Sequence, residues 1–529
     1  MKDGKKCSLP FIQGVLFCED KLRTRQRVNK MLFNSLQFLI FFPIVVLIYY
    51  LIPNRIKYIW LLLASYYFYM CWNAKYVLLL LFSTTVTYFS GIFLEKIKQK
   101  EQWDEQKKKL RKNLVLAASF VLNLGVLFYF KYMNYVMVFL QNVFSVVHVQ
   151  LNTPTFDIIL PVGISFFTFQ ALSYTMDVYR DEIYAEKNFF RYALFVSFFP
   201  QLVAGPIERS KNLLKQLADP QKFEFERARE GLLLMLWGYF LKVVLADRIS
   251  LFVDTIYGNY DNFTGWYLLT ATVLFAVQIY CDFSGYSVIA MGAAKILGIR
   301  LMENFDAPYL AASVAEFWRR WHISLTTWFR DYLYFPLGGN RKGKLRKYVN
   351  KMIVFLVSGV WHGANITYVI WGALNGCYQI IGEMLLPVRQ KITARLGIKT
   401  ESISTRLVRT LFTFILVDFS WIFFRAETLK ISFRIIHNMT LLNNPWILID
   451  GSLYECGLDA KNFWMMLFCI GVLIAADICK YFKIRIREII TDQNEWFICV
   501  VFIFAICFIL TFGIWGPGYN DANFIYFQF

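Results

Sequence analysis

Long apolar runs separated by short polar segments fill the chain from Met31 onward. Most of these runs approach or reach the roughly 20 residues that a helix needs to cross a hydrocarbon core of about 30 Å. We predict spans near 32–52, 58–73, 76–94, 114–131, 157–176, 230–247, 264–282, 349–361, 364–386, 407–424, 462–480 and 496–515. The pattern therefore predicts an all-α, polytopic integral membrane protein with about a dozen crossings, some of them re-entrant.

The segment 189–216 interrupts this pattern. Its apolar part is short, contains Pro200, Gly205 and Pro206, and has basic residues on both flanks. Basic flanks on both sides favour a re-entrant segment, which enters and leaves by the same face. An ordinary kinked span is the other interpretation, and the sequence leaves both open. Small residues at 285–294 predict a helix that packs closely against a neighbour.

Residues 1–30 differ from the rest because they are polar and basic. Either Met31 is the true start of the protein, or residues 1–30 form a disordered tail. The very basic loop at 95–113 belongs in the cytoplasm, which would place the residues before Met31 outside, where basic clusters are unfavourable. We expect residues 31–529 to form a single membrane domain, with core motifs at 157–375 and C-terminal spans at 400–529.

Composition supports a membrane protein and narrows its chemistry. The chain is 57% hydrophobic, 19% aromatic and 18% charged, with a formal net charge of +19. Since the basic residues occupy short loops between apolar runs, we attribute the charge to topology and membrane lipid contact, not to nucleic acid. The ten cysteines contain no CxxC pair, so we expect neither a disulfide framework nor a metal site, and no tightly bound cofactor.

Two of the four histidines, His322 and His362, lie in the stretch 317–363, and each follows a tryptophan. Placed on a helix, Trp318, His322 and Leu325 would share one face. Histidine is well suited to proton transfer near neutral pH, so we interpret the stretch as a reaction centre. For His322 the alternative is an interfacial histidine in an aromatic and basic belt, and for His362 it is a histidine bonded across helices.

Other reaction types have little support in the sequence. There is no GxSxG elbow, Walker loop, dinucleotide fingerprint or HExxH pair in a suitable context. The LGGNRKGK run at 337–344 offers amides and basic groups that could hold a phosphate. Taken alone, however, it is typical of a positively charged cytoplasmic loop.

Several motifs together resemble the membrane-bound O-acyltransferase (MBOAT) family. They are MLFNSLQFLIFFPIVVLIYYL, LPVGISFFTFQALSYTMDVYR, FFPQLVAGPIERS, the run from CDFSGYS to FPLGGNR, and VSGVWHGANITYVIWG. The most similar branch is that of the bacterial alginate O-acetyltransferases, and the D-alanine transfer proteins of teichoic acid modification form a related branch. The resemblance implies a helical bundle with a central funnel. It places the family's near-invariant histidine at His362 and its second characteristic position at His322.

The resemblance implies an O-acyltransferase of the bacterial cell membrane that acetylates an exported or cell-wall polysaccharide. Acetyl-CoA would be the cytoplasmic donor, and an extracytoplasmic acyltransferase partner protein would serve the polysaccharide or teichoic-acid acceptor. His362 would act as general base, and His322 would orient the donor or polarise its carbonyl. Arg319, Arg320 and Arg341 would hold the donor phosphates.

Three other functions and one other mechanism remain open at this point. A D-alanyl transferase would differ only in its donor. A transporter of lipid-linked sugars would predict internal repeats, and the sequence has none that we can detect. An assembly scaffold would not require His362. Within the acyltransferase interpretation, a covalent acyl intermediate on Cys281 or Ser284 is an alternative to direct transfer.

Overall fold

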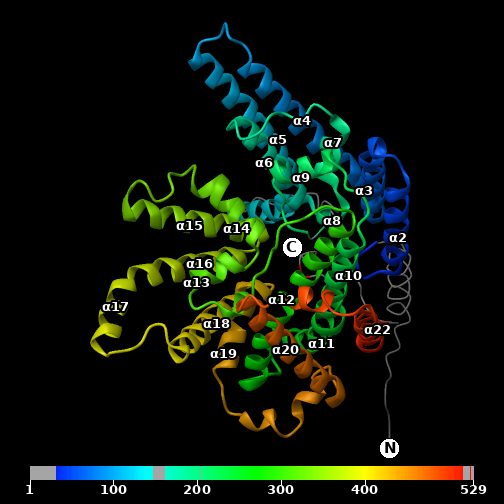
Figure 1. The fold of residues 1–529 in the computed structure, drawn as a ribbon. Coiled ribbons are helices and arrows are strands. Elements are labelled where there is room, and N and C mark those ends of the chain that lie inside the picture. Colours follow the sequence, from blue (N-terminus) through cyan, green and yellow to red (C-terminus); the bar gives the residue numbers. More distant parts are fainter. Residues whose placement is uncertain (1–30, 147–160, 204, 516–524, 526–529) are drawn as a thin grey trace, which may run out of the picture.

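The structure is a computed structural model that describes residues 31–146, 161–203, 205–515 and 525; the predicted extension at 1–30 lies outside these residues. The described residues form helices joined by turns, without a strand among them (Figure 1). Six helical stretches of the described chain are apolar and long enough to cross a membrane: Asn54–Lys98, Glu105–Ser145, Trp266–Ile296, Ile403–Arg425, Ala460–Tyr481 and Glu495–Phe512. The all-α membrane architecture is confirmed, and the number of crossings stays a prediction.

The first described helices follow the first predicted spans. They are α2 (Leu36–Leu51), α3 (Lys57–Asn73), α4 (Val77–Lys98) and α5 (Glu105–Val146). Ser35 begins α2, because its hydroxyl oxygen accepts a hydrogen bond of 3.3 Å from the Phe38 amide. Helix α5 continues well past the predicted end of its span at Lys131, so this lysine lies within a helix.

The segment after α6 (Ile164–Tyr179) is broken into short helices. They are α7 (Phe189–Ser197), α8 (Phe199–Leu202) and α9 (Ser210–Ala218). At about 1.5 Å per residue, none of the three is long enough to cross a core of about 30 Å. All four residues of α8 are buried, so protein shields this irregular backbone. The arrangement favours the re-entrant interpretation over a single kinked span.

Polar contacts connect the adjacent ends of α4, α5 and α6, beside the basic loop that the sequence predicts to be cytoplasmic. Lys98 lies 2.5 Å from Asp181, which follows α6, and Lys112 lies 3.4 Å from the same carboxylate. The hydrogen bond from the Lys98 ammonium lowers the pKa of the Asp181 carboxyl, since it stabilises the ionised form.

Helices α10 (Phe225–Tyr239) and α12 (Trp266–Ile296) pack at close range. A Cβ atom at Gly238 would lie 2.7 Å from the Gly285 carbonyl oxygen, and one at Gly231 would lie 2.8 Å from that of Gly292. The predicted close approach at 285–294 is therefore confirmed for both glycines of α12.

A buried ionic cluster joins α12 to the π-helix η4 (Phe240–Ala246) and to α11 (Asp247–Gly258). The Lys242 ammonium lies 2.6 Å from Asp282 and 2.8 Å from Asp247, and all three side chains are buried. Buried charges of this kind are tolerated only when they are paired, and here the three paired residues come from three consecutive elements of the bundle core.

The central motif forms α13 (Val314–Arg320), α14 (Ile323–Phe329), the π-helix η6 (Arg330–Tyr334), α15 (Gly343–His362) and α16 (Ile366–Met384). Helices α15 and α16 form an antiparallel pair at one side of the molecule (Figure 1). Their approach depends on glycine, because a Cβ atom at Gly359 would overlap the Tyr368 carbonyl oxygen and one at Gly372 would overlap that of Phe355.

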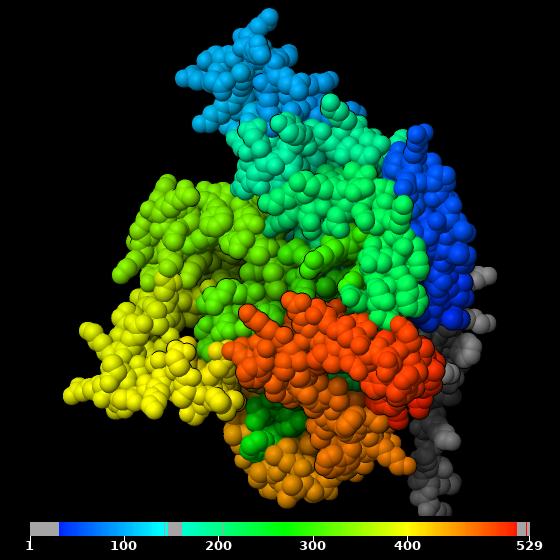
Figure 2. All heavy atoms as spheres, viewed as in Figure 1, coloured from blue at the N-terminus to red at the C-terminus, as the bar shows by residue number. Residues whose placement is uncertain are grey.

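The C-terminal part of the chain packs on this core. Its helices are α17 (Leu386–Arg395), α18 (Ile403–Arg425), α19 (Leu429–Met439), α20 (Ala460–Tyr481), α21 (Ile486–Thr491) and α22 (Glu495–Phe512). Figure 2 shows the red-orange last part of the described chain lying across the middle of one face, with the orange segment that precedes it below. Helix α18 contacts both α12 and α16, so it joins the C-terminal part to the helices of the central motif.

Two glycines of α16 allow a direct test of this packing. Gly372→Ala should lower the melting temperature of the purified protein by several degrees, since overpacking costs about 1–3 kcal/mol. Gly382→Ala is the matched control, because a Cβ atom there meets nothing within 4 Å. Alanine is the better helix former, so the control should be neutral or slightly stabilising. Thermal unfolding in detergent measures both variants, and equal melting temperatures would contradict the packing account.

Candidate active site

His362 is the last residue of α15, and a glycine ends the helix there. Gly363 is extended, and a Cβ atom at this position would overlap the ring of Tyr368 on α16. Helix α16 begins immediately afterwards, because the Asn365 side chain accepts a hydrogen bond of 3.2 Å from the Thr367 amide. The Trp-His-Gly sequence therefore places the imidazole at the tight turn between two packed helices.

Aromatic rings surround the His362 imidazole, which is 5% exposed. Its centroid lies 4.7 Å from that of Trp361, 5.0 Å from that of Trp371 and 5.1 Å from that of Phe424. Trp371 comes from α16 and Phe424 from α18, so three helices form the pocket wall around this side chain. An apolar enclosure of this kind excludes water from the imidazole.

His322 lies between two helices, so the predicted single helix through Trp318, His322 and Leu325 is wrong. Its backbone is left-handed, with φ 44° and ψ 54°. The chain breaks here because Asn304 supplies partners for the first amides of α14. The Ile323 amide donates to the Asn304 carbonyl at 2.9 Å, and the Ser324 amide donates to the Asn304 side chain at 3.2 Å. The three residues are nevertheless all buried.

The break points the His322 side chain, which is 1% exposed, toward the same aromatic cluster. Its ring centroid lies 4.6 Å from that of Phe283 and 6.4 Å from those of Phe166 and Trp361. Trp361 thus contacts both imidazoles. The structure brings together the two histidines that the sequence singled out, although 40 residues separate them in the chain.

A stack of aromatic rings leads from this pair toward the end of α6. Phe169 stacks on Trp361 with centroids 5.4 Å apart and on Trp328 at 4.1 Å. Trp328 in turn lies 5.1 Å from Tyr332, whose hydroxyl donates a hydrogen bond to Asp177. The histidines are therefore connected by direct packing to the end of α6, where the sequence predicts the cytoplasmic face.

The three predicted arginines are not equivalent. The Arg320 guanidinium pairs with two carboxylates, Asp306 at 3.2 Å and Glu316 at 3.1 Å. Arg319 and Arg341 are exposed. In the 337–344 loop, the Asn350 amide donates to the Gly339 carbonyl at 2.9 Å, which fixes the turn. Arg320 thus has a structural explanation, and Arg319 and Arg341 are available to a ligand from solution.

Two residues that sequence reasoning missed hold the histidines in place. Asn304 accepts hydrogen bonds from the first amides of α14 next to His322, and Lys131 on α5 donates a hydrogen bond to the Trp361 carbonyl next to His362. Lys131 had a visible signal, since it is a single lysine within an apolar run. No sequence pattern marks Asn304, because the amides that it binds lie about 20 residues further along the chain.

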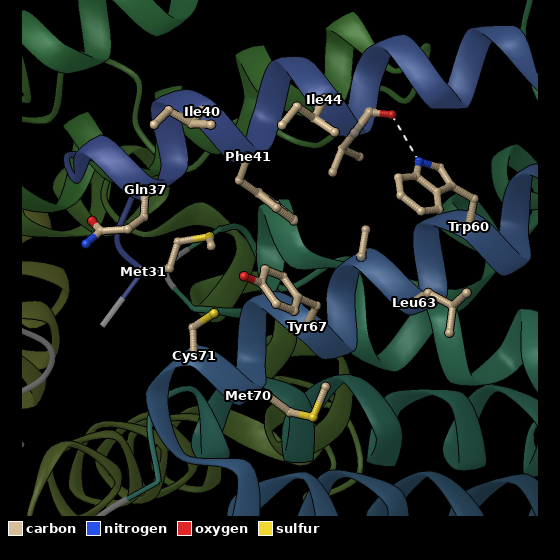
Figure 3. Close-up of a pocket in the computed structure, with 12 residues that line it drawn as sticks. Met31, Gln37, Ile40, Phe41, Ile44, Trp60, Leu63, Tyr67, Met70 and Cys71 are labelled. Carbon is tan, nitrogen blue, oxygen red and sulfur yellow. Dashed lines mark hydrogen bonds between the residues drawn. The ribbon is translucent and has the colours of Figure 1, made fainter. Parts of the chain in front are cut away.

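A separate groove of about 910 Å³ lies between α2 and α3 (Figure 3). Its lining is mostly apolar, and the Trp60 indole at one end donates a hydrogen bond of 3.0 Å to the Val45 carbonyl. Exposed side chains such as Ile40 and Leu63 line it, which is typical of a surface that faces lipid. The histidines are not among its lining residues.

The apolar helices and the buried histidine pair define an integral membrane protein with two histidines enclosed among aromatic rings. The sequence profile of MBOAT, the membrane-bound O-acyltransferase family, matches residues 61–424, a range that includes both histidines. The chain belongs to this family. It is accordingly a multi-pass membrane protein and an acyltransferase.

Relatives with assigned names agree with the family. A probable alginate O-acetylase of Pseudomonas syringae pv. tomato is 37% identical over 409 residues, which cover 76% of this chain and 74% of the relative. A peptidoglycan O-acetyltransferase of Helicobacter pylori is 34% identical, covering 79% and 81%. A teichoic acid D-alanyltransferase of Bacillus subtilis is 29% identical, covering 44% and 62%.

Removing the Asn304 side chain should impair the reaction without touching either histidine. Asn304→Ala leaves the Ser324 amide without its acceptor, so His322 should shift, and small misplacements of a reacting group cost about 10²-fold. Acyl transfer by membranes that contain the variant should fall by about 10- to 100-fold. Asn259→Ala, at an exposed helix end, is the control and should be normal. Normal transfer by Asn304→Ala would refute this positioning role.

Proposed function

We propose that this acyltransferase moves acetyl groups from cytoplasmic acetyl-CoA to hydroxyl groups of an exported or cell-wall polysaccharide. The observation that carries the proposal is the contact of His322 and His362 with one indole, Trp361, in a buried centre. O-Acetylation is supported by the relatives named alginate O-acetylase and peptidoglycan O-acetyltransferase, each matched over about three quarters of its length or more.

His362 would act as general base. A ring nitrogen accepts the proton of the acceptor hydroxyl while that oxygen attacks the thioester carbonyl carbon. The tetrahedral intermediate then collapses with cleavage of the carbon–sulfur bond, and the departing thiolate takes up the proton. General base catalysis typically contributes about 10²–10⁴-fold. The aromatic enclosure supports this role because it keeps water, a competing nucleophile, away from the thioester.

His322 would orient the donor or polarise its carbonyl oxygen. Its position supports either role, since the ring lies against Trp361 on the side of α14 while His362 comes from α15. The acyl group would therefore sit between side chains from two different elements. The base and the group that binds the donor would then belong to separate parts of the bundle, as transfer across a membrane requires.

Arg319 and Arg341 would bind the phosphates of acetyl-CoA from the cytoplasm. Both side chains are exposed, and guanidinium groups suit phosphate geometry. Arg320, the third predicted contact, would contribute indirectly by holding α13 through Asp306 and Glu316. An extracytoplasmic acyltransferase partner would serve the polysaccharide acceptor on the outer face.

D-Alanyl transfer to teichoic acid is the second candidate. It is supported by the Bacillus subtilis relative, whose match covers less of this chain than the matches of the O-acetyltransferases. Transfer that depends on a thioester carrier protein, with no use of acetyl-CoA, would identify the D-alanyl activity. Within either function, an acyl-enzyme on Cys281 or Ser284, both buried on α12, stays an alternative to direct transfer.

The histidine assignment is tested in a deletion strain. His362→Ala should restore no measurable O-acetyl groups on the exported polysaccharide, because the general base is lost, and His322→Ala should restore few. His437→Ala is the matched control, since this histidine is exposed on α19. The three variants must be present in the membrane at equal levels. Full acetylation by His362→Ala would overturn the assignment and would favour a scaffold or a transporter.

The arginine assignment predicts two different phenotypes. The double variant Arg319→Ala/Arg341→Ala should raise the KM for acetyl-CoA about 10-fold or more with little change in kcat, because charge-assisted hydrogen bonds contribute about 1.5–3 kcal/mol each. Arg320→Ala should instead lower the melting temperature, because it removes the ion-pair partner of Asp306 and leaves Glu316 with Arg406 alone. Initial rates in inside-out membrane vesicles give KM and kcat. An unchanged KM in the double variant would exclude these residues from donor binding.

A further inference from the structure

Lys131 is a basic residue inside the apolar part of α5, the sequence around it being LFYFKYMNYV. A lysine within a membrane-spanning helix costs about 2.5–3.5 kcal/mol on insertion scales. Such residues pair with one another or with backbone carbonyls, and they commonly mark functional sites. Within the described part of the chain, no ion pair joins Lys131 to a carboxylate.

The lysine reaches the end of α15 instead. Its ammonium donates a hydrogen bond to the carbonyl oxygen of Trp361 and lies 5.6 Å from the centroid of the Trp361 indole. The next residue, Tyr132, donates its hydroxyl to the carbonyl oxygen of Val360. Two neighbouring side chains of α5 thus bind two neighbouring carbonyls that immediately precede His362.

Helix geometry explains why these carbonyls are available. The last four carbonyl groups of an α-helix have no partner within the helix, and α15 ends at His362. Val360 and Trp361 belong to this last turn. The negative end of the helix dipole also favours a cation at this point. The contact therefore satisfies the backbone and, at the same time, brings a positive charge next to the indole that touches both imidazoles.

We propose that Lys131 is a positioning residue of the acyl-transfer centre. It fixes the last turn of α15, and with it the orientation of Trp361 and His362, and its charge is required beside the site where the transferring group becomes negative. This inference rests on the proposed function, since it assigns Lys131 a role through His362. Tyr132 makes a similar contact without a charge. Variants of the two residues therefore separate the effect of the charge from the effect of holding the end of α15.

The test compares three variants in inside-out vesicles from the deletion strain, with radiolabelled acetyl-CoA as donor. Lys131→Met, which keeps most of the length of the side chain and removes its charge, should lower kcat at least 10-fold and leave KM for acetyl-CoA within about twofold. Lys131→Arg should recover at least a third of the wild-type kcat. Tyr132→Phe should keep most of it. Melting temperatures of the purified variants show whether each one is folded.

Each other result counts against the inference. Wild-type kcat in Lys131→Met would overturn it. Equal losses of kcat and of melting temperature in Lys131→Met and Tyr132→Phe would show a structural clamp alone. An arginine variant as inactive as the methionine variant would remove the requirement for charge. His362→Ala, measured alongside, separates the two proposals: if it is active, the proposed function fails, and if it is inactive while Lys131→Met is active, only the role of Lys131 fails.

Discussion

Every backbone N–H and C=O group inside the bundle requires a hydrogen-bond partner from the protein, because water is absent there, and the rest of the structure depends on this constraint. The described site meets this need twice at a helix end. Asn304 accepts from the first amides of α14, and Lys131 with Tyr132 donates to the last carbonyls of α15. Each of these contacts lies next to a histidine. Two of the residues that satisfy the broken backbone, Asn304 and Lys131, are therefore placed next to the histidines whose orientation we propose that they fix.

Packing converts these two helix ends into one centre. Glycines at 359, 363 and 372 let α16 approach α15 closely enough for rings from α15, α16 and α18 to enclose His362. Trp361 contacts both imidazoles and continues into the stack through Phe169 and Trp328. The centre is thus enclosed by aromatic rings on one side and connected on the other to the end of α6, where the sequence predicts the cytoplasmic face. Both properties suit a thioester donor whose acyl group must reach an acceptor and not water.

Much of the fold and of the candidate site could be predicted from the sequence. The predictions that were wrong or missing have physical causes. Apolar runs and paired histidines in tryptophan-containing motifs predicted the helical membrane architecture and the two candidate residues. Helical periodicity predicted one helix where α13 and α14 are separate, because periodicity takes no account of a distant hydrogen-bond acceptor such as Asn304. Arg320 was predicted to bind the donor because of its charge, and that role stays a prediction. Its ion pair with Glu316, four residues earlier, has the spacing of a helical ion pair. Lys131 was predicted to lie at the end of a span, where a lysine is common. The sequence could not indicate its contact with α15, because the Trp361 carbonyl is 230 residues away.

The most direct measurement is an experimental structure with a non-hydrolysable acetyl-CoA analogue. If the histidine pair is the reaction centre, the carbonyl group of the analogue should lie within hydrogen-bond distance of His322 or His362 and against Trp361. Its nucleotide should then lie at the cytoplasmic end of the aromatic stack. An analogue whose acyl group lies elsewhere, for example in the groove between α2 and α3, would contradict the central claim.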